Sequence, residues 1–270
     1  MTDTAIPEAA KGDPQTRHRV AVVLLTLAFL AFLLAPWSLM TKLRAIGFGI
    51  CPQRASHSYF IAGVQLPLEA RMVGIFGGFL ATLIYLWALG RRKSIDFPRA
   101  PYLLLLVLFI AAMGFDGLNN FAHDLGLPHL YSPYNPARLA TGLLTGLSFA
   151  NIVWPIFNFT FWREGEKEAP LQNSKELGGA LVISVLLFLG VTSNQALLLY
   201  PLSILSIGGM VVLVTMLNTI MVLVVGRKEG QGTSGWDLLL PATFGLMLSA
   251  VELGALSLLR LITLGPGPLP

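Results

Sequence analysis

The sequence predicts an all-α fold, a polytopic membrane bundle of about seven transmembrane helices with a structured outer loop. Of its 270 residues, 54% are hydrophobic and only 12% are charged, about half the charged fraction of a soluble domain. The apolar residues gather in runs of about 20, long enough to cross roughly 30 Å of hydrocarbon. These observations exclude soluble classes. The net charge of +4 is therefore explained by basic residues that collect in cytoplasmic loops and set the orientation in the membrane. The expected partner is the lipid bilayer and not nucleic acid.

Residues 1–18 are polar and lack apolar periodicity, so we predict a disordered cytoplasmic tail. The apolar run at 20–35 follows the basic pair Arg17 and Arg19, which is also typical of a secretory signal. No small-x-small cleavage site follows it, and further spans come after. We therefore predict an uncleaved first transmembrane helix that ends near Pro36.

Six further apolar runs predict the remaining spans, at 70–89, 101–118, 138–162, 177–191, 202–225 and 236–264. The apolar segment 192–201 is too short to span; it extends the fifth span or lies flat at the interface. We expect residues 19–265 to form a single transmembrane domain, followed by a short tail at 266–270.

Basic residues predict the orientation, because they collect in cytoplasmic segments. With the N-terminus inside, the cytoplasmic segments hold Lys11, Arg17, Arg19, Arg91, Arg92, Lys93, Arg99, Arg163, Lys167, Lys175, Arg227 and Lys228. The outer side holds Lys42, Arg44, Arg54, Arg71, Arg138 and Arg260. This asymmetry predicts a cell-membrane protein with a cytoplasmic N-terminus and an external C-terminus.

Glycines indicate where helices approach closely. Gly74 and Gly78, like Gly142 and Gly146, show the Gly-x-x-x-Gly spacing that lets two backbones meet. The contact is within the chain or at a dimer face, and the need of seven helices for many contacts favours the chain itself. A homo-oligomer or a larger membrane complex stays open.

The first outer loop, residues 41–68, is long for a connector, and such loops are often functional. Two β-prone stretches flank Ala62 and Gly63, which predicts a short hairpin over the bundle mouth. The second outer loop, 119–137, ends in Asn135 and Pro136. We expect Asn135 to cap the next helix and Pro136 to lie in its first turn.

Ionisable residues gather at the outer ends of the predicted spans, where an unpaired charge is costly. In one interpretation Arg71 and Arg138 bind an anionic group while Asp116 holds them in place. In the other, the charges form two structural ion pairs, Asp116 with one arginine and Glu69 with the other. The candidate binding residues are Arg71, Asp116, Arg138, Glu69, Asn119 and His57.

Polar side chains also lie deep in the predicted spans. In the fourth span they recur at spacings of three and four, which makes one stripe. Glu252 is either a protonatable relay or cation site, or a neutral acid hydrogen-bonded to an asparagine; burial without a cation raises the pKa of such an acid. The intramembrane polar candidates are Asn151, Asn158, Asn218 and Glu252.

No metal or catalytic site is predicted. His57, His123 and His129 could join Cys51 and Glu69 as transition-metal ligands, but no helical ligand spacing and no Cys-x-x-Cys pair supports this. The single cysteine is expected to be a small buried residue. Neither Ser-x-x-Lys nor Gly-x-Ser-x-Gly occurs, so we predict no catalytic residue and no cofactor.

Several residues keep a distinctive spacing: Cys51, Gln53, Ser58, Gly63, Gln65, Pro67, Ala70-Arg71, Gly74-Ile75 and Gly77, then Asp116-Gly117, and Arg138 with Thr141-Gly142. This pattern resembles a family of small prokaryotic membrane proteins of unknown function. The family motif reads Cys-His-Gln, then Arg-Ser-Phe, a Gly, and Cys-Ala-Arg-Cys before a Gly-Ile-Tyr helix. The likeness covers residues 51–146.

The chain departs from that motif where the family has its thiols. Pro52 replaces the histidine, His57 an arginine, and Glu69 and Met72 the second and third cysteines. Any metal or redox role of those thiols would therefore be largely lost here. The likeness implies the location of a site and no activity.

The leading functional hypothesis is transport or permeation of a small polar or anionic species through the outward-facing Arg/Asp site. The alternative is a structural or assembly subunit of a membrane complex. A third is a membrane-embedded enzyme acting on a lipid head group, for which no nucleophile is evident. An enzyme is therefore the less favoured reading, and the expected ligand is a small anion or a lipid head group.

Overall fold

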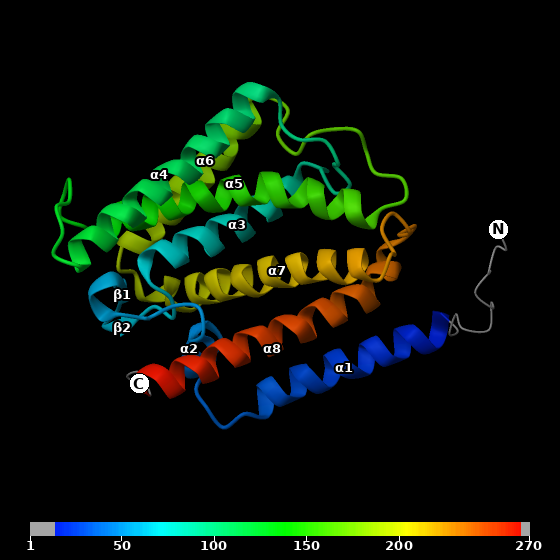
Figure 1. The fold of residues 1–270 in the computed structure, drawn as a ribbon, viewed down its shortest axis with the longest axis horizontal. Coiled ribbons are helices and arrows are strands. Elements are labelled where there is room, and N and C mark those ends of the chain that lie inside the picture. The colour runs from blue at the N-terminus through cyan, green and yellow to red at the C-terminus, as the bar shows by residue number, and fades with distance from the viewer. Residues whose placement is uncertain (1–13, 266–270) are drawn as a thin grey trace.

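The computed structural model describes residues 14–265, which form an all-α bundle (Figure 1). Its elements are α1 (Pro14–Leu34), α2 (Leu39–Gly47), η2 (Ala55–His57), β1 (Phe60–Ile61), β2 (Val64–Gln65), α3 (Ala70–Ala88), α4 (Ala100–Asp124), α5 (Asn135–Phe161), α6 (Ser174–Thr192), η3 (Ala196–Leu198), α7 (Leu199–Val225), η4 (Gly235–Leu238) and α8 (Leu239–Leu264). Within the described residues, six helices, α3 to α8, are long and apolar enough to cross a membrane. The predicted fold class is confirmed.

The first predicted span, at 20–35, corresponds to α1, which lies against α8 (Figure 1). Its apolar part, Arg19–Leu34, is shorter than the other six, so the count of seven spans stays a prediction. The helix begins at Pro14, a few residues before the predicted boundary. The rest of the predicted tail, residues 1–13, and the predicted tail at 266–270 lie outside the described residues.

Helix α3 lies at the centre, between α5 and α7 (Figure 1). In the most apolar window of α3 and of α5, 61% of residues are buried, against 11% in α4. Helices α3 and α5 therefore form the core, and α4 faces outward over much of its length.

Glycines bring α3 and α5 into backbone contact. A Cβ atom added at Gly74 would lie 2.6 Å from the carbonyl oxygen of Leu139. One added at Gly142 would overlap the carbonyl oxygen of Arg71. The glycine spacing thus serves a contact within the chain, as the sequence favoured. It also places the start of α3 against the first turns of α5.

The outer loop is ordered and contains a helix that the sequence did not predict. Helix α2 occupies residues 39–47, and the side chain of Ser38 caps it by accepting a hydrogen bond from Thr41 N (3.2 Å). The predicted hairpin is confirmed as β1 and β2. Its turn residues, Ala62 and Gly63, have φ angles of 51° and 78°, the left-handed conformation that a tight two-residue turn requires.

The predicted end of the third span, at residue 118, was wrong. Helix α4 continues to Asp124, so Asn119 lies inside it and the second outer loop starts only after residue 124. Polar side chains are tolerated there because they have partners on the neighbouring loop and helix. In the segment 192–201, α6 ends at Thr192 and does not extend further; the short 3₁₀ turn η3 leads directly into α7, and a position of this segment at the interface stays a prediction.

Candidate functional site

A cavity of about 220 Å³ opens where the outer loop meets α3, α4 and α5. Its lining consists of Arg54, His57, Glu69, Arg71, Gly117, Asn120, Phe121, Asp124 and Arg138. Four of the six predicted binding residues are among them: His57 and Glu69 from the outer loop, Arg71 from α3 and Arg138 from α5. Asp116 lies directly behind this lining, through its contacts with Arg71 and Asn120.

Asp116 is only 2% exposed and is fully engaged. Arg71 Nη2 lies 2.5 Å from its Oδ2, and Asn120 Nδ2 donates to the same oxygen over 3.1 Å. The Tyr131 hydroxyl donates to Oδ1 over 2.5 Å. Burial and the neighbouring carboxylate raise the pKa of Tyr131 to about 12, so this tyrosine remains a protonated donor. Together these contacts fix the position of Arg71.

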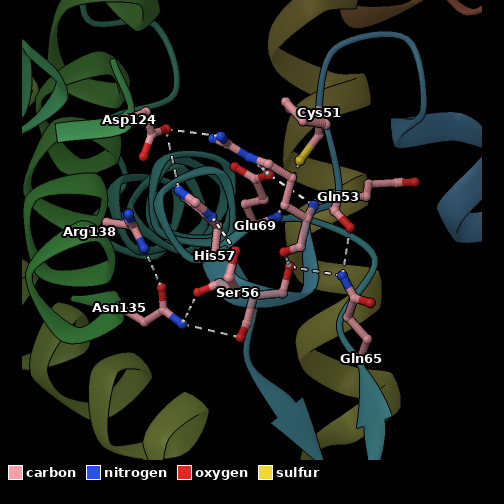
Figure 2. Close-up of polar contacts among 12 residues, drawn as sticks. Cys51, Gln53, Ser56, His57, Gln65, Glu69, Asp124, Asn135 and Arg138 are labelled. Carbon is pink, nitrogen blue, oxygen red and sulfur yellow. Dashed lines mark hydrogen bonds and ion pairs between the residues drawn. The ribbon is translucent and has the colours of Figure 1, made fainter. Parts of the chain in front are cut away.

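Arg138 is 6% exposed, yet it has no carboxylate partner. Within residues 14–265 no Asp or Glu oxygen lies within 4.0 Å of its guanidinium nitrogens. Its Nη1 donates to Asn135 Oδ1 over 2.8 Å (Figure 2). The expectation that Asp116 holds both arginines was wrong, because Asp116, in the C-terminal half of α4, forms an ion pair with Arg71 and not with Arg138.

Asn135 does not cap α5 as expected, because Tyr134 occupies the N-cap position; Pro136 lies in the first turn, as predicted. The Asn135 side chain instead joins α5 to the outer loop. Its Nδ2 donates to the carbonyl oxygens of Ser56 (3.3 Å) and Ser58 (3.2 Å) (Figure 2). Its oxygen is thereby turned toward Arg138.

Glu69 pairs with Arg54 rather than with either predicted arginine. Its Oε1 accepts from Arg54 N (2.9 Å) and Arg54 Nε (3.2 Å). The same guanidinium donates to Asp124 Oδ2 over 3.0 Å. Arg54 therefore links the outer loop to the end of α4. The sequence carried no signal for this pair, since Arg54 and Asp124 are far apart in the chain and α4 was expected to end before Asp124.

His57 presents a free ring nitrogen to the cavity. Its Nδ1 lies 2.9 Å from Ser56 Oγ, whereas its Nε2 lies 3.8 Å from Asp124 Oδ2, beyond hydrogen-bond distance. Burial lowers the pKa of His57, and the nearby Arg138 and Arg54 lower it further. A neutral imidazole is therefore favoured. Ser56, His57 and Asp124 do not form a catalytic triad, because the Asp124 carboxylate is bound to Arg54.

Three buried polar atoms of the lining residues have no hydrogen-bond partner. They are His57 Nε2, Arg71 Nε and Asn120 Oδ1. Buried polar atoms are nearly always satisfied by protein, water or a ligand. The cavity lining thus contains three buried hydrogen-bonding atoms that no described residue satisfies.

The outer loop forms one side of the cavity, and hydrogen bonds to the start of α3 and to α8 hold it in place. Cys51 is 1% exposed, and its Sγ accepts from Glu69 N over 3.2 Å. Arg260, near the end of α8, donates to the carbonyl oxygens of Phe48 and Cys51 (both 2.6 Å) and of Pro52 (2.7 Å). The lone cysteine is buried, as expected, and burial raises the pKa of its thiol to about 11.

Asn119 and the candidates in α5 do not join the cavity. Asn119 Oδ1 accepts from Leu130 N (2.8 Å) and shapes the α4–α5 loop. Asn151 is buried and donates to the carbonyl oxygen of Leu147 in its own helix. Asn158, near the other end of α5, donates to the carbonyl oxygen of Ser94.

Asn218 and Glu252 meet each other instead of the stripe on α5. Asn218 Nδ2 donates to Glu252 Oε2 over 2.7 Å and to Ser249 Oγ over 3.0 Å. This contact corresponds to the interpretation of Glu252 as an acid hydrogen-bonded to an asparagine. It joins α7 to α8.

His123 and His129 contact each other. The rings of His123 and His129 lie edge to face, with centroids 4.8 Å apart. In the part of the chain that the structure describes, no group of three or more His, Cys, Asp or Glu side chains is placed to hold a metal ion.

The cavity is lined entirely by residues between Arg54 and Arg138, and the comparison with known proteins concerns this segment. Residues 51–152 match a family described as predicted membrane protein (DUF2085). This match confirms the predicted resemblance to an uncharacterised membrane-protein family, and it covers the outer loop from residue 51, α3, α4 and the first part of α5. The DUF2085-like segment therefore contains every residue that lines the cavity.

One curated relative is an uncharacterized protein, MJ1492, of Methanocaldococcus jannaschii. It is 28% identical over 108 residues, which are 40% of this chain and 64% of the relative. The chain thus spans somewhat less than two thirds of that relative's length. No solved structure matches. The comparisons support an integral membrane protein and name no activity.

Proposed function

We propose that this membrane protein binds a small anionic group in its outer cavity, as the binding step in transport or permeation of a small polar or anionic species. The main observation in support of this proposal is the buried guanidinium of Arg138, which lines the cavity without a carboxylate partner. A buried cation is costly unless it is paired. A bound anion supplies the missing charge.

The shape of the cavity supports a small ligand. A volume of about 220 Å³ holds several water-sized groups, each about 30 Å³. It suits a phosphate, a carboxylate or the phosphate of a lipid head group. Arg71 is held by Asp116, but it also lines the cavity, and its buried Nε has no hydrogen-bond partner.

Transport requires a second arrangement of the core helices. Beside the cavity α3 and α5 meet backbone to backbone at the Gly74–Leu139 contact, and in this proposal the two helices separate there when the protein changes arrangement. We propose that the structure represents the outward-facing arrangement. In the proposed topology the N-terminus is cytoplasmic and the C-terminus external in the cell membrane, since basic residues are concentrated at the other end of the bundle.

The structural-subunit hypothesis has its own supporting observation. Arg54 joins Glu69 and Asp124, and Arg71 pairs with Asp116. These pairs lock the ends of α3 and α4 to the outer loop. Arg138 separates the two hypotheses, because a purely structural role does not need an arginine without a carboxylate partner.

The test measures anion binding by the purified full-length protein. Inorganic phosphate, acetate and glycerol phosphate are titrated by calorimetry into the wild type, Arg138→Gln, and Arg99→Gln, an exposed arginine at the opposite end of the bundle. We expect Arg138→Gln to weaken binding by about tenfold or more, with unchanged folded yield, and Arg99→Gln to behave as wild type. Binding of none of these probes, or loss of folded protein in Arg138→Gln, would contradict the proposal.

Uptake of the tightest-binding probe into proteoliposomes then separates transport from binding alone. We expect flux that Arg138→Gln abolishes and Arg99→Gln retains. Binding without flux would leave the site in place and assign the protein to the subunit class.

A further inference from the structure

A second cavity, of about 750 Å³, lies toward the opposite end of the bundle, between α3, α5, α7 and α8. Its volume is in the range of about 300–1,000 Å³ that ligand pockets occupy. The lining is apolar over almost its whole extent and includes Leu83, Trp87, Trp154, Val212 and Leu246. Such a wall suits hydrocarbon chains.

Among the described residues, the lining of this cavity includes one charged side chain, that of Arg92. The guanidinium carbon of Arg92 lies 4.7 Å from the centre of the Trp87 ring. The neighbouring Arg91 is bound to Glu168 and Glu176. Within the described chain no carboxylate lies within 4.0 Å of Arg92. Its charge is therefore available to a ligand.

A hydroxyl group inside the apolar wall is also available. Thr215 Oγ1 is buried and has no hydrogen-bond partner. Thr219, one turn later on α7, donates to the carbonyl oxygen of Thr215 over 2.7 Å, as helical threonines commonly do. The free hydroxyl of Thr215 is a hydrogen-bond donor in a place where hydrocarbon alone would leave it unsatisfied.

We propose that this cavity binds an anionic phospholipid. The lipid phosphate lies at Arg92, and an ester carbonyl oxygen accepts a hydrogen bond from the Thr215 hydroxyl. The acyl chains occupy the apolar part of the cavity between α3 and α8. An anionic phospholipid fits better than a zwitterionic lipid, which supplies less net negative charge at Arg92. It also fits better than a free anion, which leaves the apolar part of the cavity empty. Arginine and tryptophan side by side are typical of the level at which lipid head groups lie.

Quenching of Trp154 fluorescence tests the proposal, because this side chain lines the cavity and is otherwise only 8% exposed. Trp154 is made the sole tryptophan by replacing the others with phenylalanine, and the protein is reconstituted with phosphatidylglycerol or phosphatidylcholine that carries brominated acyl chains. We expect phosphatidylglycerol to quench more effectively. Arg92→Gln should reduce this preference about fivefold, whereas Arg99→Gln, an exposed arginine outside the cavity, should not change it.

Ala242→Phe, which fills the cavity from α8, should remove quenching by both lipids. Retention of phosphatidylglycerol by the native protein through detergent exchange provides the same comparison if the single-tryptophan protein does not fold. Equal quenching by both lipids, unaffected by Arg92→Gln, would show ordinary annular lipid and overturn the proposal. Loss of quenching as the protein-to-lipid ratio rises would assign the cavity to a second copy of the chain and also overturn it.

Discussion

Arg71 and Arg138 line the same cavity, but only Arg71 has a carboxylate partner, Asp116 at 2.5 Å. The two arginines are neighbours because Gly142, one turn after Arg138, lies against the backbone of Arg71. One arginine is thus held in a network, and the other is left with a single amide contact to Asn135.

Removing Arg71 should destabilise the fold through the partner it leaves behind. In Arg71→Gln the buried carboxylate of Asp116 loses its counter-ion, which we expect to cost about 3 kcal/mol. Adding Asp116→Asn should recover most of that loss, because the charge then disappears. Thermal unfolding in detergent, followed by circular dichroism, measures the difference. A double variant no more stable than the single one would show that the ion pair is not what Arg71 contributes.

The glycine contact between α3 and α5 should not tolerate a methyl group. In Gly142→Ala the new Cβ meets the carbonyl oxygen of Arg71, and we expect a loss of about 1–3 kcal/mol. Gly178→Ala in α6 is the matched control, since no atom lies within 4 Å of its added Cβ. This control should be neutral or slightly stabilising, as alanine favours helix. Equal unfolding midpoints for the two variants would contradict the backbone contact.

Stability should fall as the pH drops below about 6.5, the ordinary pKa of histidine. The folded-state pKa of His57 lies below that value, because of burial and the charges of Arg138 and Arg54. Between the two pKa values the unfolded chain binds the proton and the folded protein does not, so protonation favours unfolding. His57→Gln should flatten the dependence of the unfolding midpoint between pH 5 and 7. An unchanged slope in this variant would place the titrating group elsewhere.

The Cys51 thiol should resist alkylation in the folded protein. Its raised pKa, about 11, leaves almost no thiolate at neutral pH, and its side chain is buried. Incubation with a maleimide at pH 7.4 should give no mass increase, while addition after unfolding in SDS should label the thiol completely. Rapid labelling of the native protein would show that the outer loop opens.

The apolar spans were predictable because bilayer thickness and hydropathy act over about 20 residues at a time. The hairpin was predictable for a local reason, since Ala62 and Gly63 separate two short β-prone stretches. Helix α2 was missed because Leu39–Gly47 is short and amphipathic. The end of α4 was missed because Asn119 and Asn120 are typical of loops, and their partners are known only from the tertiary structure.

The pairing of charges was not predictable in the same way. The sequence gathers Glu69, Arg71, Asp116 and Arg138 at one end of the bundle, and the structure brings them around one cavity. Which acid meets which arginine depends on the rotation of α3, α4 and α5 about their axes. Arg54, the actual partner of Glu69, lies on a loop whose path no periodicity describes.

The contact of Arg260 with the outer loop has a consequence for biogenesis. The carbonyl oxygens that Arg260 binds belong to residues 48–52, more than 200 positions earlier in the chain. During synthesis those early residues reach their side of the membrane long before α8 is made. The outer loop therefore lacks the hydrogen bonds from Arg260 until α8 has inserted. The side of the cavity that this loop forms reaches its final structure only then.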